Sequence, residues 1–339
     1  YLITLGFSFK QVILFFLIQS IIHIIYVPFV AKLGSKIGFK KSMLLGLPFT
    51  IYSFYLLFTL QTDLTMLLTY GFFKEIGSTM FYMSYHVLFA KYTEKNNRGK
   101  ELGFLDIITS SLGTLAPFIG GLILAKYSIN ILIIIIGILL LISISPLFFS
   151  KDYKEKSQIK IRKYFTFKNK KYFIAFFGHG IENMMNTLVW PIFIFFYIYS
   201  SYIFLGFATT LISVISVISA YFIGKYTDKN KTIMLKIGAS ISSIIWVIKY
   251  IIATPLSVSI INSTKGISQK LTHIPFNAIS YELANKINLI SFLLYREIVI
   301  HLGRIFLYII LLLFITNIKT AFIFGIIANL TYFFLNKLK

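Results

Sequence analysis

The chain contains no cysteine and few acidic residues, and both shortages narrow its possible chemistry. Without cysteine, disulfides, thiolate metal sites and cysteine nucleophiles are excluded. Only 11 of the 339 residues are Asp or Glu, and all four aspartates stand isolated from one another. No D-x-x-D or H-E-x-x-H pattern occurs, so the clustered acids that would hold a metal-bound diphosphate are missing. An integral-membrane transferase is therefore a weak alternative for this chain.

Apolar residues, by contrast, are abundant. Hydrophobic residues make up 57% of the chain and aromatic residues 18%, whereas charged residues make up only 13%. The mean hydropathy is +0.82. This charged fraction is about half of what soluble domains carry. The composition therefore predicts a polytopic membrane protein.

Apolar runs separated by short polar breaks recur along the whole sequence. A helix needs about 20 mainly apolar residues to cross the hydrocarbon core of a bilayer, and the chain divides into eleven such runs. We therefore predict an all-α fold with eleven visible transmembrane helices. Their predicted limits are 9–31, 42–60, 64–90, 101–125, 130–149, 172–198, 203–224, 232–253, 257–284, 289–315 and 318–336.

Basic residues are concentrated in every second break. Twenty-four lie in breaks on one side of the predicted membrane, and only Lys126 and Lys319 lie in breaks on the other. By the positive-inside rule the rich side is cytoplasmic, which accounts for the net charge of +22 without a nucleic-acid partner. We therefore expect a multi-pass protein of the plasma or inner membrane with a cytoplasmic C-terminus and the lipid bilayer as its partner.

The one long polar segment, residues 151–171, divides the chain into two parts. We predict an N-terminal transmembrane bundle over 1–150, a central cytoplasmic loop over 151–171 and a C-terminal bundle over 172–339. Five helices precede the loop and six follow it. Because the first span runs inward and the chain begins at Tyr1, we expect one further helix upstream and a six-plus-six arrangement.

A basic loop is repeated in the two parts. Ala31 aligns with Gly224 and Ser35 with Asp228, each 193 positions later. Small residues let helices approach closely, Asp or Ser accepts hydrogen bonds from amides at a helix start, and bases hold a loop near anionic headgroups. The predicted gating residues are Ser35, Lys36, Gly38 and Lys40 in the first copy and Gly224, Asp228 and Lys229 in the second.

This repeat resembles the cytoplasmic loop motif of the major facilitator superfamily, roughly G-x-x-x-D-R/K-x-G-R/K-R/K. The second copy matches at Gly224, Asp228 and Lys229, whereas Ala31 and Ser35 depart from the motif in the first copy. A gating salt bridge that the family builds on this Asp is therefore not expected in the first half. A generic basic loop is the alternative interpretation.

A second segment, LGTLAPFIGG over residues 112–121, is similar to a fifth-helix motif of exporters in the same superfamily. Pro117, Gly120 and Gly121 match it, but Leu112 and Ala116 do not. The resemblance implies two six-helix bundles that alternate access to a central cavity lined by the first, fourth, seventh and tenth helices. It implies a secondary transporter of a small solute, for which we expect proton coupling. It does not give the direction of transport.

Ionisable residues inside the predicted spans form stripes at helical spacing. Each ionisable side chain costs about 2.5 to 3.5 kcal/mol at the bilayer centre, so it needs a partner, surrounding water or a function. We predict that three stripes line a path for solute and protons. They comprise His179, Glu182, Asn186 and Trp190, then Lys74, Glu75 and Tyr82, then Lys265, Gln269 and His273.

Glu182 is our first choice for a proton-carrying carboxylate. It lies about ten residues into its span, roughly 15 Å from the start of the helix and near the midplane, and a low-dielectric site favours its protonated form. A structural, hydrogen-bonded Glu remains an equal alternative. Lys74 and Glu75 either bind solute or pair across the bundle.

A fourth charged stripe is expected to be structural. Arg296, Glu297, His301 and Arg304 lie close enough along one span to form an ion-pair network that holds the cytoplasmic half together. We predict no cofactor, no metal and no enzymatic activity, with a small solute and protons as ligands of a monomer. A membrane scaffold or receptor that keeps the fold without transporting is the main alternative.

Overall fold

The computed structural model describes residues 2–3, 5–127, 129–155, 159, 165, 169–252, 254–313 and 318–335. Within these residues the secondary structure is helical without strands, and eleven helical spans confirm the predicted all-α membrane fold. The first spans are α1 (Phe9–Ile37), α2 (Phe39–Phe58), α3 (Leu64–Tyr92), α4 (Arg98–Lys126), and α5 (Ile129–Ser143) with α6 (Ser145–Phe149). The others are α7 (Lys170–Met184) with its continuation to Ile198, α9 (Tyr202–Lys229), α10 (Lys231–Ile251), α11 (Pro255–Ile287), α12 (Leu289–Leu313), and Ile318–Phe334 with α13 (Phe322–Leu330) at its centre.

The span that begins with α7 departs from a regular α-helix. A π-helical turn, η3 (Met185–Val189), separates it from the short α8 (Trp190–Phe193), and a second π-turn, η4 (Ile194–Ile198), ends it. Pro191 follows the first π-turn. Proline has no N–H to give to the carbonyl four residues earlier, which explains why the regular bonding pattern changes here.

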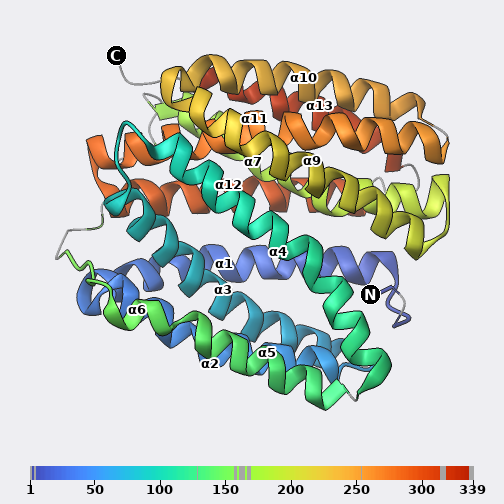
Figure 1. Ribbon diagram of the computed structural model, residues 1–339, viewed down its shortest axis with the longest axis horizontal. Helices are drawn as coiled ribbons and strands as arrows, with labels where there is room; N and C mark the ends of the chain where they lie inside the picture. Colours follow the sequence, from blue (N-terminus) through green and yellow to red (C-terminus); the bar gives the residue numbers. More distant parts are fainter. Residues whose placement is uncertain are drawn as a thin grey trace.

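Helices before and after the central segment form two sides of the molecule (Figure 1). Helices α1, α2, α3 and α5 lie on one side, and α7 and α9 to α13 lie on the other. The sides meet where α1 packs against α12 and α4 packs against α9. We call the end that carries the base-rich connections near Lys36, Arg98 and Lys229 the basic end, and the other the opposite end.

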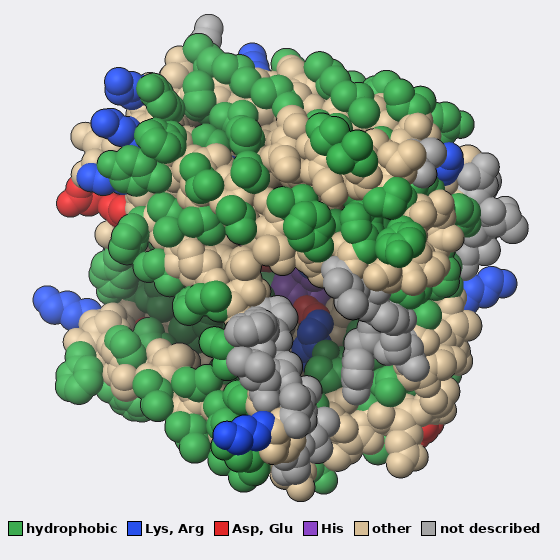
Figure 2. Space-filling model, turned by 45° about the vertical axis from the view of Figure 1, so that its right-hand side comes forward, with side chains coloured by type: hydrophobic (Ala, Val, Ile, Leu, Met, Phe, Trp, Pro, Cys, Tyr) green, Lys and Arg blue, Asp and Glu red, His purple; other side chains and the backbone are tan. Residues whose placement is uncertain are grey.

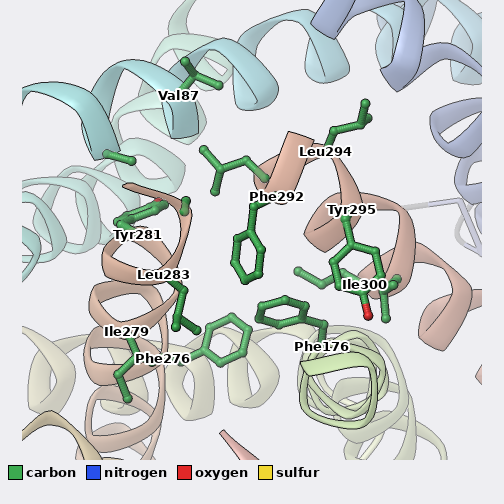
Figure 3. Close-up of a cluster of buried hydrophobic side chains, with 14 of the residues drawn as sticks. Val87, Phe176, Phe276, Ile279, Tyr281, Leu283, Phe292, Leu294, Tyr295 and Ile300 are labelled. Carbon is green, nitrogen blue, oxygen red and sulfur yellow. The ribbon is translucent and has the colours of Figure 1, made fainter. Parts of the chain in front are cut away.

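One continuous apolar core joins the two sides at the basic end. It combines Val30 of α1 and Val87 of α3 with Phe176, Tyr281 and Phe292 of the other side. Figure 3 shows the aromatic rings of this core packed between the helices. Toward the opposite end the core splits into two clusters, one around Phe15 and Leu67 and the other around Trp190 and Trp246. The two sides therefore share one broad core at the basic end, whereas at the opposite end they meet through α1, whose Ile13 packs in the second cluster.

Helices α4 and α9 diverge from the basic end to the opposite end. At the basic end a Cβ on Gly99 would lie 2.7 Å from the Gly224 carbonyl oxygen, and one on Gly103 2.6 Å from that of Ala220, so the backbones touch. Toward the opposite end, a Cβ on Gly113 of α4 would meet nothing within 4 Å. The pair thus forms a V that is closed at the basic end.

The outer surface of the molecule is apolar, as a membrane protein requires. Large hydrophobic side chains are exposed over most helices, including Phe149 (92%) and Leu256 (71%), and they cover much of the face in Figure 2. In the described residues, six helices are long and apolar enough to cross a membrane by themselves. Helices α3, α11 and α12 instead carry charged side chains that they bury toward the interior.

Candidate functional site

A polar cavity of about 590 Å³ lies between the two sides of the molecule. It is lined by residues of α1, α3, α7, η3, α11 and α12. Figure 2, in which the opposite end comes forward, shows a hollow between the sides with histidine, acidic and basic side chains inside it. Its size is ordinary for a small-molecule site.

Glycines bring α7 close enough to α12 to build one wall of this cavity. A Cβ on Gly180 would collide with the Ile300 carbonyl, and one on Gly303 would collide with that of Phe177. Small residues permit such close packing between membrane helices. The approach explains why Asn183 of α7 lies beside Arg304 of α12, with 3.5 Å between Oδ1 and Nη2.

Two buried side chains connect α1 to α3 on the other wall. The Nδ1 atom of His23 lies 2.8 Å from the Glu75 carboxylate and 3.0 Å from the Thr79 hydroxyl. The ring of His23 also stacks on that of His301, at 3.6 Å between centroids. Glu75, which we predicted to bind solute or to pair across the bundle, therefore pairs with a histidine.

The predicted network on α12 lines the cavity with all four members. Arg296 donates to Glu297 at 2.8 Å, and Glu297 also lies 3.6 Å from Nε2 of His86 on α3. Arg304 contacts His301 Nε2 at 3.2 Å instead of Glu297. The network therefore reaches from α12 across the cavity to the other side of the molecule.

Glu182 is fully buried and lies behind the cavity wall. Its carboxylate is 3.2 Å from Lys265 Nζ and 3.3 Å from His273 Nε2, and it accepts a hydrogen bond from Asn186 at 2.5 Å. Of these four residues only His273 lines the cavity. The geometry makes Glu182 the centre of a buried polar cluster with one histidine between it and the cavity.

The predicted pathway residues separate into two groups. Five line the cavity: Lys74, Glu75, Tyr82, His179 and His273. The others, Glu182, Asn186, Trp190, Lys265 and Gln269, are not among its lining residues. Trp190 is instead a core side chain whose indole N–H donates to Asn262 at 2.9 Å.

Four further residues that were not predicted from the sequence also line the cavity: Gln19, His23, His86 and Asn183. In hindsight the signal for all four is helical spacing to another residue that lines the cavity. Gln19 and His23 are four residues apart on α1, as are Tyr82 and His86 on α3, so each pair shares a helix face. The same spacing marks Asn183, which lies four residues after His179 on α7.

Two groups in the described residues place potential metal ligands within 4.8 Å of one another. They are His23, Glu75 and His301, and His179, Glu182 and His273. Each has a fixed cation against it, because Arg304 donates to His301 and Lys265 pairs with Glu182. These cations occupy the lone pairs and repel an added positive charge, so neither group fits a metal ion well.

The second loop copy closes the basic end through Asp228. Its carboxylate accepts the backbone N–H groups of Gly99 at 2.6 Å and Lys100 at 2.9 Å, at the start of α4. An acidic side chain is stabilised at a helix start by free amides and the helix dipole. Gly224 lies against the Gly99 carbonyl, and Lys229 lies over the Tyr226 ring.

The first loop copy is built differently. The Ser35 hydroxyl donates back to the Lys32 carbonyl within α1, so it caps no neighbouring helix. Instead Asp152 accepts the N–H of Lys40 at 2.8 Å, at the start of α2. Gly38, at φ 111°, is required here, because a side chain would collide with Asp152. Lys36 ends α1 at this loop.

The exporter-like segment lies on α4 where it diverges from α9. Gly120 faces open space. The surroundings of the Pro117 and Gly121 positions lie outside the described residues.

Comparison with known proteins decides the family. A model of the Major Facilitator Superfamily matches residues 2–295. The chain belongs to this superfamily. The family and its neighbours indicate a multi-pass membrane transporter rather than an enzyme, and the predicted resemblance to this superfamily is confirmed.

Solved structures of superfamily transporters share the fold. A bacterial homologue of the iron transporter ferroportin, in an outward-facing state, has a TM-score of 0.70 at 13% identity, over 96% of this chain and 90% of that one. The human organic anion transporter MFSD10 has a TM-score of 0.69 at 11% identity, over 96% of this chain and 83% of that one. The Escherichia coli fucose:proton symporter FucP has a TM-score of 0.68 at 14% identity, over 96% of this chain and 90% of that one. No curated protein sequence matches the chain significantly.

Proposed function

We propose that this protein is a secondary active transporter that carries a small solute by alternating access. In this proposal the bundles 1–150 and 172–339 rock about the cavity, and residues 151–171 connect them. The carrying observation is that a continuous core closes the cavity between the two sides at the basic end, while α4 and α9 diverge and a hollow opens at the opposite end. A site between two packed units that is accessible from one end suits this mechanism.

The charge of the connections supports an orientation for this state. With the basic end in the cytoplasm, as the positive-inside rule favours, the cavity opens to the outside of a plasma or inner membrane. The C-terminus then lies inside.

Alternating access is testable because the chain has no cysteine of its own. Spin labels on Lys100→Cys and Lys225→Cys report the gap between α4 and α9 at the basic end, and labels on Lys126→Cys and Ser200→Cys report the opposite end. All four side chains are exposed. We expect two distance populations in each pair, anticorrelated as pH is varied in nanodiscs. One fixed distance in both pairs under all conditions would instead support a non-transporting scaffold or receptor.

Protons are the coupling ion in this proposal, and Glu182 is their carrier. His273 touches both the cavity and the Glu182 carboxylate, so it provides a path for a proton to the buried group. Lys265 balances the negative charge when the proton is absent. The charge of the Glu182 carboxylate is thus neutralised by the proton when one is bound and by Lys265 when none is bound.

We expect Glu182→Gln to abolish the pH dependence of the label distances while both populations persist. Glu94→Gln is the matched control, since Glu94 is an exposed carboxylate at the basic end. If the distances in Glu182→Gln still respond to pH as in the parent protein, another group carries the proton.

A further inference from the structure

The cavity contains more positive than negative fixed charge. Its lining includes three cations, Lys74, Arg296 and Arg304, but only two carboxylates, Glu75 and Glu297. Both carboxylates have partners: Glu297 is bonded to Arg296, and Glu75 to His23. The cations thus exceed the carboxylates by one, and Lys74 and Arg304 are the two cations without a carboxylate in contact.

Neither of these two cations has a carboxylate in direct contact among the described residues, although Glu75 attracts both at longer range. Lys74 Nζ has one polar contact, Gln19 Oε1 at 3.4 Å. Arg304 contacts neutral acceptors on His301 and Asn183, and its Nε is buried with no hydrogen-bond partner within the described part of the chain. No carboxylate described lies within 4.0 Å of either cation. Two cations that face one cavity without a carboxylate in contact attract an anion into it.

The cavity surface next to these cations is partly apolar. Phe16, Met184, Leu188, Ile300 and Tyr308 line it together with the polar groups. A guanidinium binds a planar carboxylate through two parallel hydrogen bonds, and an ammonium adds a point charge. This combination suits a charged head and an apolar body.

Resting on the proposed transport function, we infer that the solute is a small organic anion held between Lys74 of α3 and Arg304 of α12. The two cations come from opposite sides of the molecule. An anion that contacts both binds most tightly when the sides are in one relative position, which gives it the differential affinity that a conformational change requires. A metal cation is the competing ligand class, and the same cations disfavour it.

The test is the charge preference of thiol modification at a single cysteine in the cavity. Thr187→Cys reports the lining near Asn183, and Ser200→Cys reports the exposed surface at the opposite end. Each is treated with the anionic sulfonatoethyl and the cationic trimethylammonioethyl methanethiosulfonate. We expect the anion-to-cation rate ratio to be about fivefold higher at position 187 than at 200, as two nearby charges produce in a wet site.

The variants assign this preference to the two cations. Arg304→Gln and Lys74→Gln should each lower the ratio toward the value at position 200, whereas Arg304→Lys and the exposed control Lys10→Gln should preserve it. Thermal unfolding of each variant in detergent verifies that it is folded, and labelling of Ser200→Cys in each background supplies its surface reference. A ratio at or below the surface value, or one that Arg304→Gln leaves unchanged, overturns the inference.

Ligand protection supplies the second measurement. Benzoate should slow the modification of Thr187→Cys by a neutral reagent more than benzamide or benzylammonium at equal concentration, and Arg304→Gln should remove this advantage. Equal protection by benzamide, or stronger protection by benzylammonium or Mn²⁺, overturns the inference. The spin-label distances are independent of this result, so a carrier of another solute is distinguishable from a protein that does not alternate.

Discussion

At the scale of single residues, Lys249 presents an unusual balance of forces. Its side chain is fully buried, and its ammonium has no hydrogen-bond partner in the described part of the chain. It lies 4.1 Å from the ring centroid of Trp190 and 3.9 Å from that of Trp246. Cation–π contacts contribute about 2 kcal/mol when desolvated, against a cost of about 2.5 to 3.5 kcal/mol for a lysine at the bilayer centre.

We therefore expect Lys249→Met to raise the stability by about 1 kcal/mol, since methionine keeps the volume and packs well on aromatic rings. Thermal unfolding in detergent measures the change. Lys236→Met, on the same helix but partly exposed, is the control and should have little effect. A marked loss of stability in Lys249→Met would mean that the buried charge is compensated by a group not recognised here.

The pair of Glu182 and Lys265 should behave in the opposite way. Lys265→Met leaves a fully buried carboxylate with only His273 and Asn186, and breaking a buried pair costs about 3 to 5 kcal/mol. Removing both charges, in the combined Glu182→Met and Lys265→Met protein, should recover most of that loss. Additive losses in this double-mutant cycle would show that the two groups act independently.

Residue roles were harder to predict from the sequence than residue positions. The stripe through His179 and Glu182 correctly indicated a face turned away from lipid, because helical spacing determines which side chains share a face. Spacing does not determine which partner arrives from another helix. Lys265 reaches Glu182 from α11, and His23 reaches Glu75 from α1, and both contacts join residues more than fifty positions apart.

At the scale of helices, the approach of α4 to α9 depends on residues without side chains. A Cβ on Gly103 would lie 2.6 Å from the Ala220 carbonyl oxygen, closer than two non-bonded atoms can pack. Gly103→Val should therefore push the helices apart at the basic end and increase the open population there, measured with the labels on Lys100→Cys and Lys225→Cys.

Gly113→Val is the matched control for this change. It lies on the same helix, but a Cβ there would meet nothing within 4 Å. Its label distances should equal those of the parent protein. Equal shifts in both variants would point to a general effect of valine on α4 rather than to the contact with α9.

The helices themselves were predictable from the sequence to within a few residues. Long apolar runs leave a chain little choice in a bilayer, since only a helix satisfies its own backbone there. The irregular parts were not predictable in this way. The π-turn before Trp190, the break between α5 and α6, and the 3₁₀ turns that flank α13 depend on local bonding that hydropathy does not report.

At the scale of the whole molecule, the cavity should be reachable from one side of the membrane. Ser78 lines the cavity, and Lys225 is exposed at the basic end. In intact cells, a membrane-impermeant thiol reagent should modify Ser78→Cys and spare Lys225→Cys. In inverted vesicles the basic end faces the reagent, so Lys225→Cys should react at least about tenfold faster than in cells. A tenfold ratio corresponds to about 1.4 kcal/mol. Modification of both from the same side would contradict the proposed orientation.

The unequal division of the apolar core also bears on the kinetics of a transport cycle. Opening the basic end must separate the large core that both sides share, whereas at the opposite end the sides share a smaller apolar contact through Ile13 of α1. Exposing packed apolar surface carries a large heat-capacity change. Inward opening should therefore be the slow step of turnover, with an activation enthalpy that varies with temperature, so an Arrhenius plot of its rate should be curved.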